Sequence, residues 1–405
     1  MTDAAVPVKT DAVTPATIAD PTYPILLAIS CCHMLNDLMQ SLLAAIYPML
    51  KAEFALDFWQ IGLLTFFYQL TASILQPIVG IVTDKRPFAW SLPIGMAFTM
   101  FGLILLAFAP RYGLLVSGAG LIGIGSSIFH PESSRVARAA SGGRFGMAQS
   151  VFQVGGNMGS AAGPLLAAFI VVPYGRPSVA YFALVALVGM VILLWVSRWQ
   201  TRDRATARRR PAPLANTLSP NRVALAVGVL VVLIFSKFVY MASMSSYYTF
   251  FLINRFNLSV QEAQQMLFLF LAAVAFGTII GGPVGDRIGR RTVIWVSILG
   301  VLPFTLMLPY ANLFWTGALS VIIGVALASA FPAIIVFGQE LLPGRVGMVA
   351  GLFFGAAFGV GGIAAAALGV LADKVGIQTV FEFCAILPVL GLLTVFLPSR
   401  RELSE

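Results

Sequence analysis

Long apolar runs alternate with short polar segments along the whole chain. Each of twelve such runs is close to or above the roughly 20 residues that a helix needs to cross a bilayer. Because a helix satisfies its own backbone hydrogen bonds in lipid, each run predicts one transmembrane helix. The predicted spans are residues 24–51, 58–83, 88–109, 113–137, 145–172, 177–199, 222–253, 260–285, 291–309, 312–339, 346–373 and 376–398.

Composition and charge agree with a membrane protein and set its orientation. Hydrophobic residues make up 59% of the 405 and charged residues only 10%, whereas soluble chains carry about 25% charge. The net charge of +9 does not indicate a nucleic-acid partner, because most basic residues fall in loops on one side of the predicted spans. Such a bias marks the cytoplasmic side, and it puts both termini there.

Polar stretches and repeated motifs divide the chain into two halves. The predicted parts are a flexible cytoplasmic tail (1–23), a six-helix bundle (24–199), a cytoplasmic linker (200–221), a second six-helix bundle (222–398) and a cytoplasmic tail (399–405). Asp84 and Asp286 occupy similar acidic and basic loops, 286 − 84 = 202 residues apart. The predicted fold class is therefore an all-α integral membrane protein with 12 transmembrane helices in two six-helix half-repeats.

A second motif repeats with nearly the same offset. The segment Gly143–Met147 (GRFGM) resembles Gly344–Met348 (GRVGM), 201 residues later, and each opens a long Gly- and Ala-rich helix. Glycines four residues apart line one face of a helix and let another helix approach closely. Three such ladders are Gly155, Gly159 and Gly163, then Gly277, Gly281 and Gly285, then Gly351, Gly355 and Gly359.

Ionisable residues inside the predicted spans are functional candidates, because charge is costly at the centre of a bilayer. His33 and Asp37 lie four residues apart in the first span, followed by Gln40, while His130 and Glu132 lie near the end of the fourth. We predict Asp37 as the main proton-coupling residue, with His130 and Glu132 next, because a buried carboxylate and a histidine can both exchange protons. The alternatives are a structural hydrogen-bond role for Asp37 and an ion pair of Glu132 with a nearby arginine.

Lys237 is an isolated base in the seventh span and predicts either a partner acid or an anionic substrate. An aromatic and methionine stripe follows it, which either lines a pocket or packs in the core. The predicted substrate-binding residues are His33, Asp37, Gln40, Gln69, Gln149, Gln153, Asn157, Lys237, Tyr240, Met244 and Tyr247. The amides belong to this set because buried amides seek partners, which a wet central cavity would supply.

Enzymatic and cofactor-binding motifs do not fit this chain. Gly118–Gly123 matches G-x-G-x-x-G, but it lies inside an apolar run with no strand before it. Cys31, Cys32 and Cys384 have no metal-ligand spacing, and G-x-S-x-G and H-E-x-x-H are absent. We therefore predict neither an enzyme nor a resident cofactor or metal. A protein that works as a monomer with a small-molecule substrate, protons and the lipid bilayer as partners is expected.

Several of these stretches resemble the major facilitator superfamily. The loop Gly281–Arg291 (GGPVGDRIGRR) is similar to the cytoplasmic signature of that family, and Gly159–Pro164 (GSAAGP) resembles the motif of its drug:proton antiporters. The resemblance implies that Asp84, Asp286, Arg287 and Arg290 latch the cytoplasmic side and that helix 5 bends at Pro164. It also implies that helix 5 meets helix 8 and helix 11 meets helix 2. The glycine ladders would then lie at the seams between the halves, unless they serve only static packing.

Further stretches resemble one branch of that family, the fosmidomycin-resistance type of bacterial efflux protein. They include His33–Asp37 (HMLND), Ser126–Arg135 (SSIFHPESSR) and Phe235–Ser243 (FSKFVYMAS). This resemblance implies proton-coupled efflux of small toxic molecules, with fosmidomycin as a candidate substrate, across the bacterial inner (plasma) membrane. A proton- or anion-coupled importer with the same fold is the alternative. Because Pro87 interrupts the first loop, the latch at Asp286 is expected to be the stronger.

Overall fold

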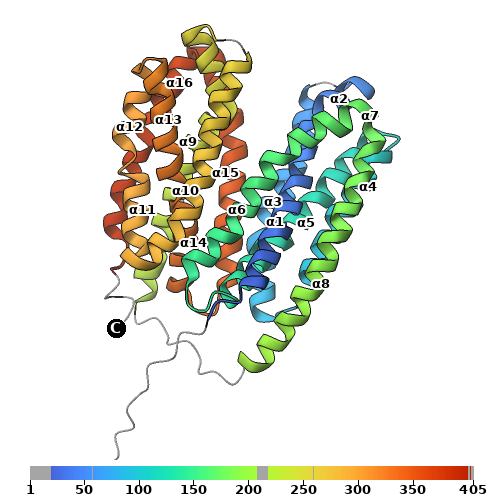
Figure 1. Ribbon diagram of the computed structural model, residues 1–405, viewed down its shortest axis with the longest axis vertical. Helices are drawn as coiled ribbons and strands as arrows, with labels where there is room; N and C mark the ends of the chain where they lie inside the picture. The colour runs from blue at the N-terminus through green and yellow to red at the C-terminus, as the bar shows by residue number, and fades with distance from the viewer. Residues whose placement is uncertain (1–19, 57, 208–217, 259, 400–401, 403–405) are drawn as a thin grey trace, which may run out of the picture.

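The computed structural model describes residues 20–56, 58–207, 218–258, 260–399 and 402. Every regular element within these ranges is a helix (Figure 1). Twelve stretches of the described chain are long and apolar enough to cross a membrane, and each overlaps one predicted span. The prediction of an all-α membrane protein is therefore confirmed. The prediction that the linker begins at residue 200 was wrong, because the sixth spanning helix continues to Ala207.

The first half contains six of these stretches. Its elements are α1 (Tyr23–Ala45), α2 (Tyr47–Glu53), α3 (Phe58–Lys85), α4 (Ser91–Phe108), α5 (Tyr112–Ala139), α6 (Phe145–Leu166), η1 (Ala167–Val171), α7 (Val172–Tyr174), η2 (Arg176–Tyr181) and α8 (Phe182–Ala207). The first predicted span is broken at Ile46, so α2 is a separate short helix. The side chain of Pro164 lies outside what the structure describes, and the bend expected there stays a prediction.

The second half repeats this plan. Its elements are α9 (Pro220–Phe256), α10 (Val260–Ile288), α11 (Arg290–Ile298), α12 (Leu302–Met307), η3 (Leu308–Tyr310), α13 (Leu313–Ala328), α14 (Ala330–Leu341), α15 (Val346–Val375), α16 (Ile377–Ile386) and η4 (Leu387–Phe396). The tenth span is divided into α13 and α14 at Ser329. Pro332 explains the break, because it has no N–H to donate to the carbonyl of Ala328.

The two halves form separate bundles that meet at one end (Figure 1). We call this the basic end, because Lys85, Arg86, Arg138, Arg290 and Arg291 lie in the helix ends and loops there. Toward the other end the ribbons of the two bundles diverge (Figure 1). The polar contacts between the halves described below gather at or near the basic end, so the structure is closed at that end.

Glycines show where two helices approach each other most closely. For two of the three glycine ladders, the neighbouring helix is not the one that the sequence predicted. A methyl group added at Gly159 would overlap the carbonyl oxygen of Met34 in α1, within the first half. One added at Gly277 would overlap Val325 of α13, within the second half. The same holds for Gly155 and Gly163 against α1 and for Gly281 against Ser329. The prediction that these ladders lie between the halves was wrong; they pack helices inside each bundle.

The third ladder does lie between the halves, as predicted. Gly351 packs against the backbone of Gln76 and Gly355 against that of Ser73, both in α3. Helices α6 and α10 also meet across the seam, but through other residues. Gly282 packs on the carbonyl of Gly146, and Asn157 Nδ2 donates to Thr278 Oγ1 at 3.1 Å. Sequence spacing identified the glycine faces without identifying the partner of each face.

Candidate proton and substrate site

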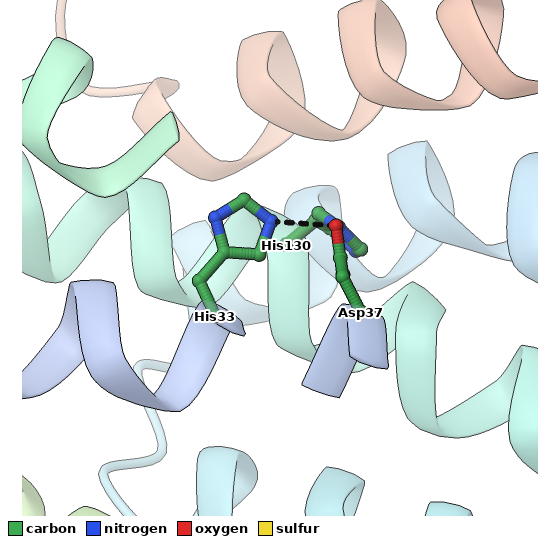
Figure 2. Close-up of side chains that lie close together, drawn as sticks. All are labelled: His33, Asp37 and His130. Carbon is green, nitrogen blue, oxygen red and sulfur yellow. Dashed lines mark ion pairs between the residues drawn. The ribbon is translucent and has the colours of Figure 1, made fainter. Parts of the chain in front are cut away.

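Three ionisable side chains meet inside the first half (Figure 2). Asp37 of α1 lies between two histidines, with Oδ2 3.3 Å from Nε2 of His33 and Oδ1 3.4 Å from Nε2 of His130 on α5. Both imidazoles are fully buried, whereas 10% of the Asp37 side chain is exposed. We call these residues the His–Asp–His cluster. The sequence predicted each member but not that His130 contacts Asp37.

Backbone contacts fix the hydrogen positions on both rings. Nδ1 of His33 lies 2.8 Å from the carbonyl oxygen of Phe152, and Nδ1 of His130 lies 3.0 Å from that of Ser126. A carbonyl oxygen only accepts, so these contacts place a hydrogen on each Nδ1; Nδ1 of His130 also lies 3.3 Å from the hydroxyl oxygen of Ser126. Each neutral ring then turns the lone pair of Nε2 toward a carboxylate oxygen. Neither Nε2 has a hydrogen-bond partner among the described residues, and one proton in each contact would turn it into a favourable interaction.

Polar side chains surround Asp37 within the cluster. Asn36 Nδ2 donates to Asp37 Oδ1 at 3.2 Å, and Tyr68 donates to Oε1 of Gln40 at 2.8 Å one helical turn further along α1. One ligand atom from each member of the cluster lies within 4.8 Å of the others, so the set could also hold a metal ion. The sequence predicts none.

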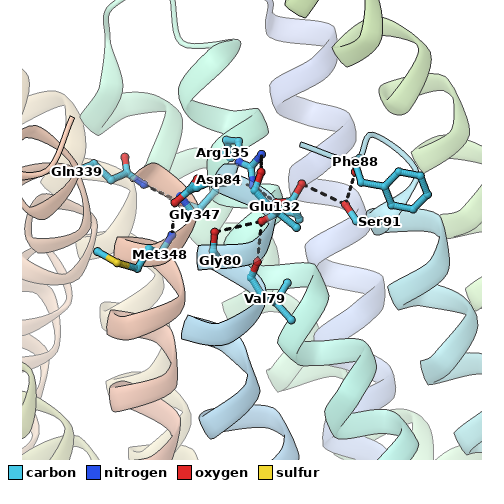
Figure 3. A network of polar contacts seen from close by, with 12 residues as sticks. Val79, Gly80, Asp84, Phe88, Ser91, Glu132, Arg135, Gln339, Gly347 and Met348 are labelled. Atoms are coloured by element: carbon cyan, nitrogen blue, oxygen red, sulfur yellow. Dashed lines mark hydrogen bonds and ion pairs between the residues drawn. The ribbon is translucent and has the colours of Figure 1, made fainter. Parts of the chain in front are cut away.

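Glu132, also predicted to exchange protons, lies in a different set of contacts (Figure 3). It forms a short ion pair with Arg135 and accepts from Ser91 Oγ at 3.1 Å. Arg135 also approaches Asp84 Oδ1, at 3.7 Å, and donates to the carbonyl of Thr83 at 2.9 Å. The structure therefore shows the alternative considered for Glu132, an ion pair with a nearby arginine. A role of Glu132 in proton coupling remains a prediction, and Glu132 is not part of the His–Asp–His cluster.

Asp84 and Asp286 each join one half to the other, and Figure 3 shows the contacts of Asp84. The Asp84 carboxylate accepts from the backbone N–H of Gly347 at 2.9 Å and of Met348 at 2.8 Å, at the start of α15. Asp286 accepts from Gly146 and Met147 at the start of α6, both at 2.9 Å. A carboxylate at a helix N-terminus is stabilised by the exposed N–H groups and the helix dipole.

The two latches make the same pair of bonds, so the expectation that Pro87 weakens the first finds no support in this geometry. Arg290 of the second loop pairs with Asp286 at 3.1 Å and with Glu340 at 3.2 Å. Arg287, predicted with it, is exposed. Each acid holds the repeated GRxGM segment of the opposite half, which links the two motifs found in the sequence.

A further cross-contact, which the sequence did not reveal, lies beside the latches. Gln339 of α14 accepts from Arg138 Nη1 at 3.2 Å and donates to Ser134 Oγ at 3.1 Å, both on α5. Ser134 in turn donates to Oε1 of Gln149 at 2.9 Å. Gln149 is fully buried in this layer, not in a wet cavity as predicted. These contacts join residues far apart in the chain, so no local pattern in the sequence predicts them.

Lys237 of α9 is buried, with 5% of the residue exposed. Its Nζ lies 5.2 Å from the ring centre of Phe238 and 5.0 Å from that of Phe331, within the range of cation–π contacts. In the part of the chain that the structure describes, it forms no ion pair with an acid. The sequence predicted that Lys237 meets either a partner acid or an anionic substrate. The described residues provide no such acid, so the anionic substrate stays a prediction.

The other predicted substrate residues fall into two groups: some are packed in the core, and others border a cavity or the contact between the halves. Tyr240 and Met244 are fully buried in the hydrophobic core of the second half, so the alternative of core packing applies to them. Tyr247 donates to the carbonyl of Ala365 at 2.6 Å and borders a cavity of about 630 Å³ between α9 and α15. Gln69 and Gln153 are partly exposed; Gln69 faces the seam beside Gly362 of α15.

Comparison with known proteins agrees with this architecture. The profile of the Major Facilitator Superfamily matches residues 29–366 and 233–405. The chain is 60% identical to the "Fosmidomycin resistance protein" of Escherichia coli (strain K12) and 39% identical to the "Uncharacterized MFS-type transporter YfnC" of Bacillus subtilis (strain 168). Each alignment covers 95% of both chains.

Solved structures share the fold at lower identity. The crystal structure of the transporter FucP in the outward conformation has a TM-score of 0.72 at 16% identity, covering 93% of this chain and 99% of FucP. The human organic anion transporter MFSD10 also has a TM-score of 0.72 at 16% identity, covering 94% of this chain and all of that one. Profile, relatives and fold agree, and the chain belongs to the major facilitator superfamily.

Proposed function

We propose that this protein exports a small anionic molecule, with fosmidomycin as the first candidate, across the bacterial inner membrane in exchange for protons. The name of the Escherichia coli relative, at 60% identity, supports this substrate and direction. The bias of basic residues supports a cytoplasmic basic end with both termini beside it. We further propose that the chain acts as a monomer and carries out no covalent chemistry.

The observation that carries the proposal is the pair of contacts from Asp37 to the two histidines, at 3.3 and 3.4 Å. Each contact is favourable only when a proton lies in it, so the cluster has places for two protons. Loading both changes its net charge from −1 to +1. A buried group whose charge changes with proton binding can bias the two arrangements of the halves, because each arrangement solvates that charge differently.

The substrate would bind in the second half. Lys237 offers a buried ammonium with no ion-pair partner among the described residues, held against the faces of Phe238 and Phe331. A phosphonate anion would supply the missing counter-charge. Each net charge moved inward through about 100 mV supplies ~2.3 kcal/mol. At ~1.4 kcal/mol per tenfold, this supports roughly fifty-fold accumulation, which is enough for export against a gradient.

The latches would set the alternation. In the arrangement closed at the basic end, Asp84 and Asp286 hold the opposite halves, and Asp37, with 10% of its side chain exposed, would receive protons from the other side. Release of these protons to the cytoplasm requires that the latches open. Substrate entering from the cytoplasm would then meet Lys237, and its export would return the protein to the closed arrangement.

Proteoliposomes with an imposed proton gradient test the proposal. Addition of fosmidomycin should cause proton movement opposite to that of the drug, and Asp37→Asn should abolish it. The matched control is Asp373→Asn, because Asp373 is an exposed acid of α15 far from the cluster in the sequence and outside it in the structure. Proton movement in the same direction as the drug would instead support the importer. Coupled exchange that survives Asp37→Asn would refute the assignment of the proton site.

A further inference from the structure

Aromatic rings from both halves close around the His–Asp–His cluster. The ring of Phe354 on α15 lies 5.0 Å from that of His130 and 6.1 Å from that of Phe152 on α6, measured between ring centres. It also lies 5.2 Å from Phe331 on α14. Phe152 in turn stacks on His33 at 4.0 Å. All three phenylalanines are buried, so the second half supplies part of the wall of a site in the first half.

Phe152 and Phe354 lie against the histidines of the cluster, and the polar contacts of the basic end lie about one helical turn further toward that end. Ser134 follows His130 by four residues in α5, and Gln149 precedes Phe152 by three residues in α6. Helix α5 runs toward the basic end and α6 begins there, so both polar residues are about one helical turn, ~5.4 Å, closer to that end. Phe354 contacts His130 and Phe152 and therefore belongs to an apolar layer at the level of His130, next to this polar layer.

We propose that Phe152, Phe331 and Phe354 form a proton seal, with Phe354 as its central residue. The seal keeps protons on the His–Asp–His cluster from reaching the basic end while the halves are closed there. Apolar constrictions block water and ions because water does not remain in them. The inference rests on the proposed function, since a seal is needed only if the cluster exchanges protons.

Unpartnered polar atoms on either side explain why the seal is needed. Nε2 of His130, which lies 3.4 Å from Asp37 Oδ1, and Nε2 of Gln149 are both buried without a hydrogen-bond partner among the described residues. A hole between such groups would hold water, because polar walls supply the hydrogen bonds that a buried water needs. Water there would connect the cluster with the layer of Ser134 and Gln149. The ring of Phe354 occupies this region and keeps it dry.

The seal is also built to open. Phe331 and Phe354 belong to the second half, whereas His33, Asp37 and His130 belong to the first. Separation of the halves at the basic end removes the two rings from the cluster and gives the protons a path to that end. The same movement that frees the substrate path therefore frees the proton path, and neither opens alone.

Proton flux without substrate is the decisive measurement. In proteoliposomes with an internal pH dye and an imposed gradient, wild-type protein should show no flux until substrate is added. Phe354→Ala should conduct protons in the absence of substrate, and the added change Asp37→Asn should abolish that leak. Phe353→Ala is the matched control, because Phe353 is equally buried and packs on Gly338 within the second half. It should not leak. Phe354→Met, which keeps the apolar bulk, should restore the seal.

The outcomes separate this inference from the proposed function. If wild type exchanges protons for substrate, Asp37→Asn does not, and Phe354→Ala stays tight, the seal is refuted and the function stands. A leak in Phe354→Ala that persists with Asp37→Asn would also refute the seal, because it would bypass the cluster. If Phe354→Ala fails to fold, Phe354→Ser or Phe331→Ala tests the same layer, with the same expected leak.

Discussion

Adjacent glycines of α10 give a direct test of which contacts control the alternation. Gly282 faces the first half, where an added methyl group would overlap the carbonyl oxygen of Gly146 and crowd Ser150 Oγ. Gly281 faces its own half, where the methyl group would lie 2.5 Å from Cα of Ser329. We therefore expect Gly282→Ala to shift the balance between the two arrangements and Gly281→Ala to destabilise the second bundle.

The expected change in the ratio of closed to open protein depends on which arrangement contains the crowded methyl group. Inserting a methyl group into a tight contact costs about 1–3 kcal/mol. At Gly282 separation of the halves relieves the strain, so the cost falls on the closed arrangement alone. A penalty of ~2 kcal/mol lowers the ratio of closed to open by roughly thirty-fold. At Gly281 both arrangements carry the cost, so the ratio is unchanged while the thermal midpoint falls.

Distance measurement between spin labels checks this. Arg144 and Arg345 are exposed beside the starts of α6 and α15, one in each half at the basic end, and each can be replaced by a labelled cysteine. Gly282→Ala should add or enlarge a long-distance population, whereas Gly281→Ala should leave the distribution like that of wild type. Equal shifts in the two variants, or no shift with Gly282→Ala, would refute the assignment of the seam.

Three further outcomes are expected. Asp84→Asn and Asp286→Asn should each weaken the closed arrangement by about 1.5–3 kcal/mol, the usual worth of a hydrogen bond to a charged group; similar shifts in the same spin-label distances would confirm that the latches are equivalent. Lys237→Met should raise the KM for fosmidomycin roughly ten- to a hundred-fold and leave Asp37-dependent proton binding intact, which transport and proton-release assays can compare. Arg176→Gln removes the 2.8 Å pair with Glu53 and the 2.7 Å hydrogen bond to the Leu106 carbonyl, both inside the first half, and should cost about 1–3 kcal/mol. It should lower the thermal midpoint and not alter the label distances.

The membrane fold was predictable because each span obeys a local rule. A helix in lipid must satisfy its own backbone groups, so length and apolar content are sufficient to find all twelve. The face that a helix presents is also local, which is why the glycine ladders were found. Their partners are not: the period of Gly155, Gly159 and Gly163 is the same whether the neighbour is α1 or α10. Only the ladder of α15 was assigned correctly.

For the candidate site too, contacts within one helix were predictable from the sequence, whereas contacts between distant residues were not. His33 and Asp37 were joined by their i, i+4 spacing, and the possible ion pair of Glu132 with Arg135 by i, i+3 spacing, both within one helix. The contact of His130 with Asp37 joins residues 93 positions apart (130 − 37) and has no local signal. Phe354 was missed for a different reason. An aromatic residue in an apolar span carries no pattern that separates a seal from ordinary core.

The half-repeat connects the two proposed binding sites. The offset of 201 that relates the GRxGM segments also relates Asp37 to Phe238 (238 − 37 = 201) and His130 to Phe331 (331 − 130 = 201). The contact between Asp37 and His130 in the first half thus corresponds to that between Phe238 and Phe331, whose ring centres are 5.2 Å apart.

Beside this second pair lies Lys237. Under the proposed function, these equivalent positions would carry exchangeable protons in the first half and would place an ammonium against two rings in the second. Such a division would suit exchange, because the half that gains and loses protons would not be the half that holds the anion. In the closed arrangement Phe331 and Phe354 connect the two sites, because Phe331 lies against Lys237 and Phe354 against His130.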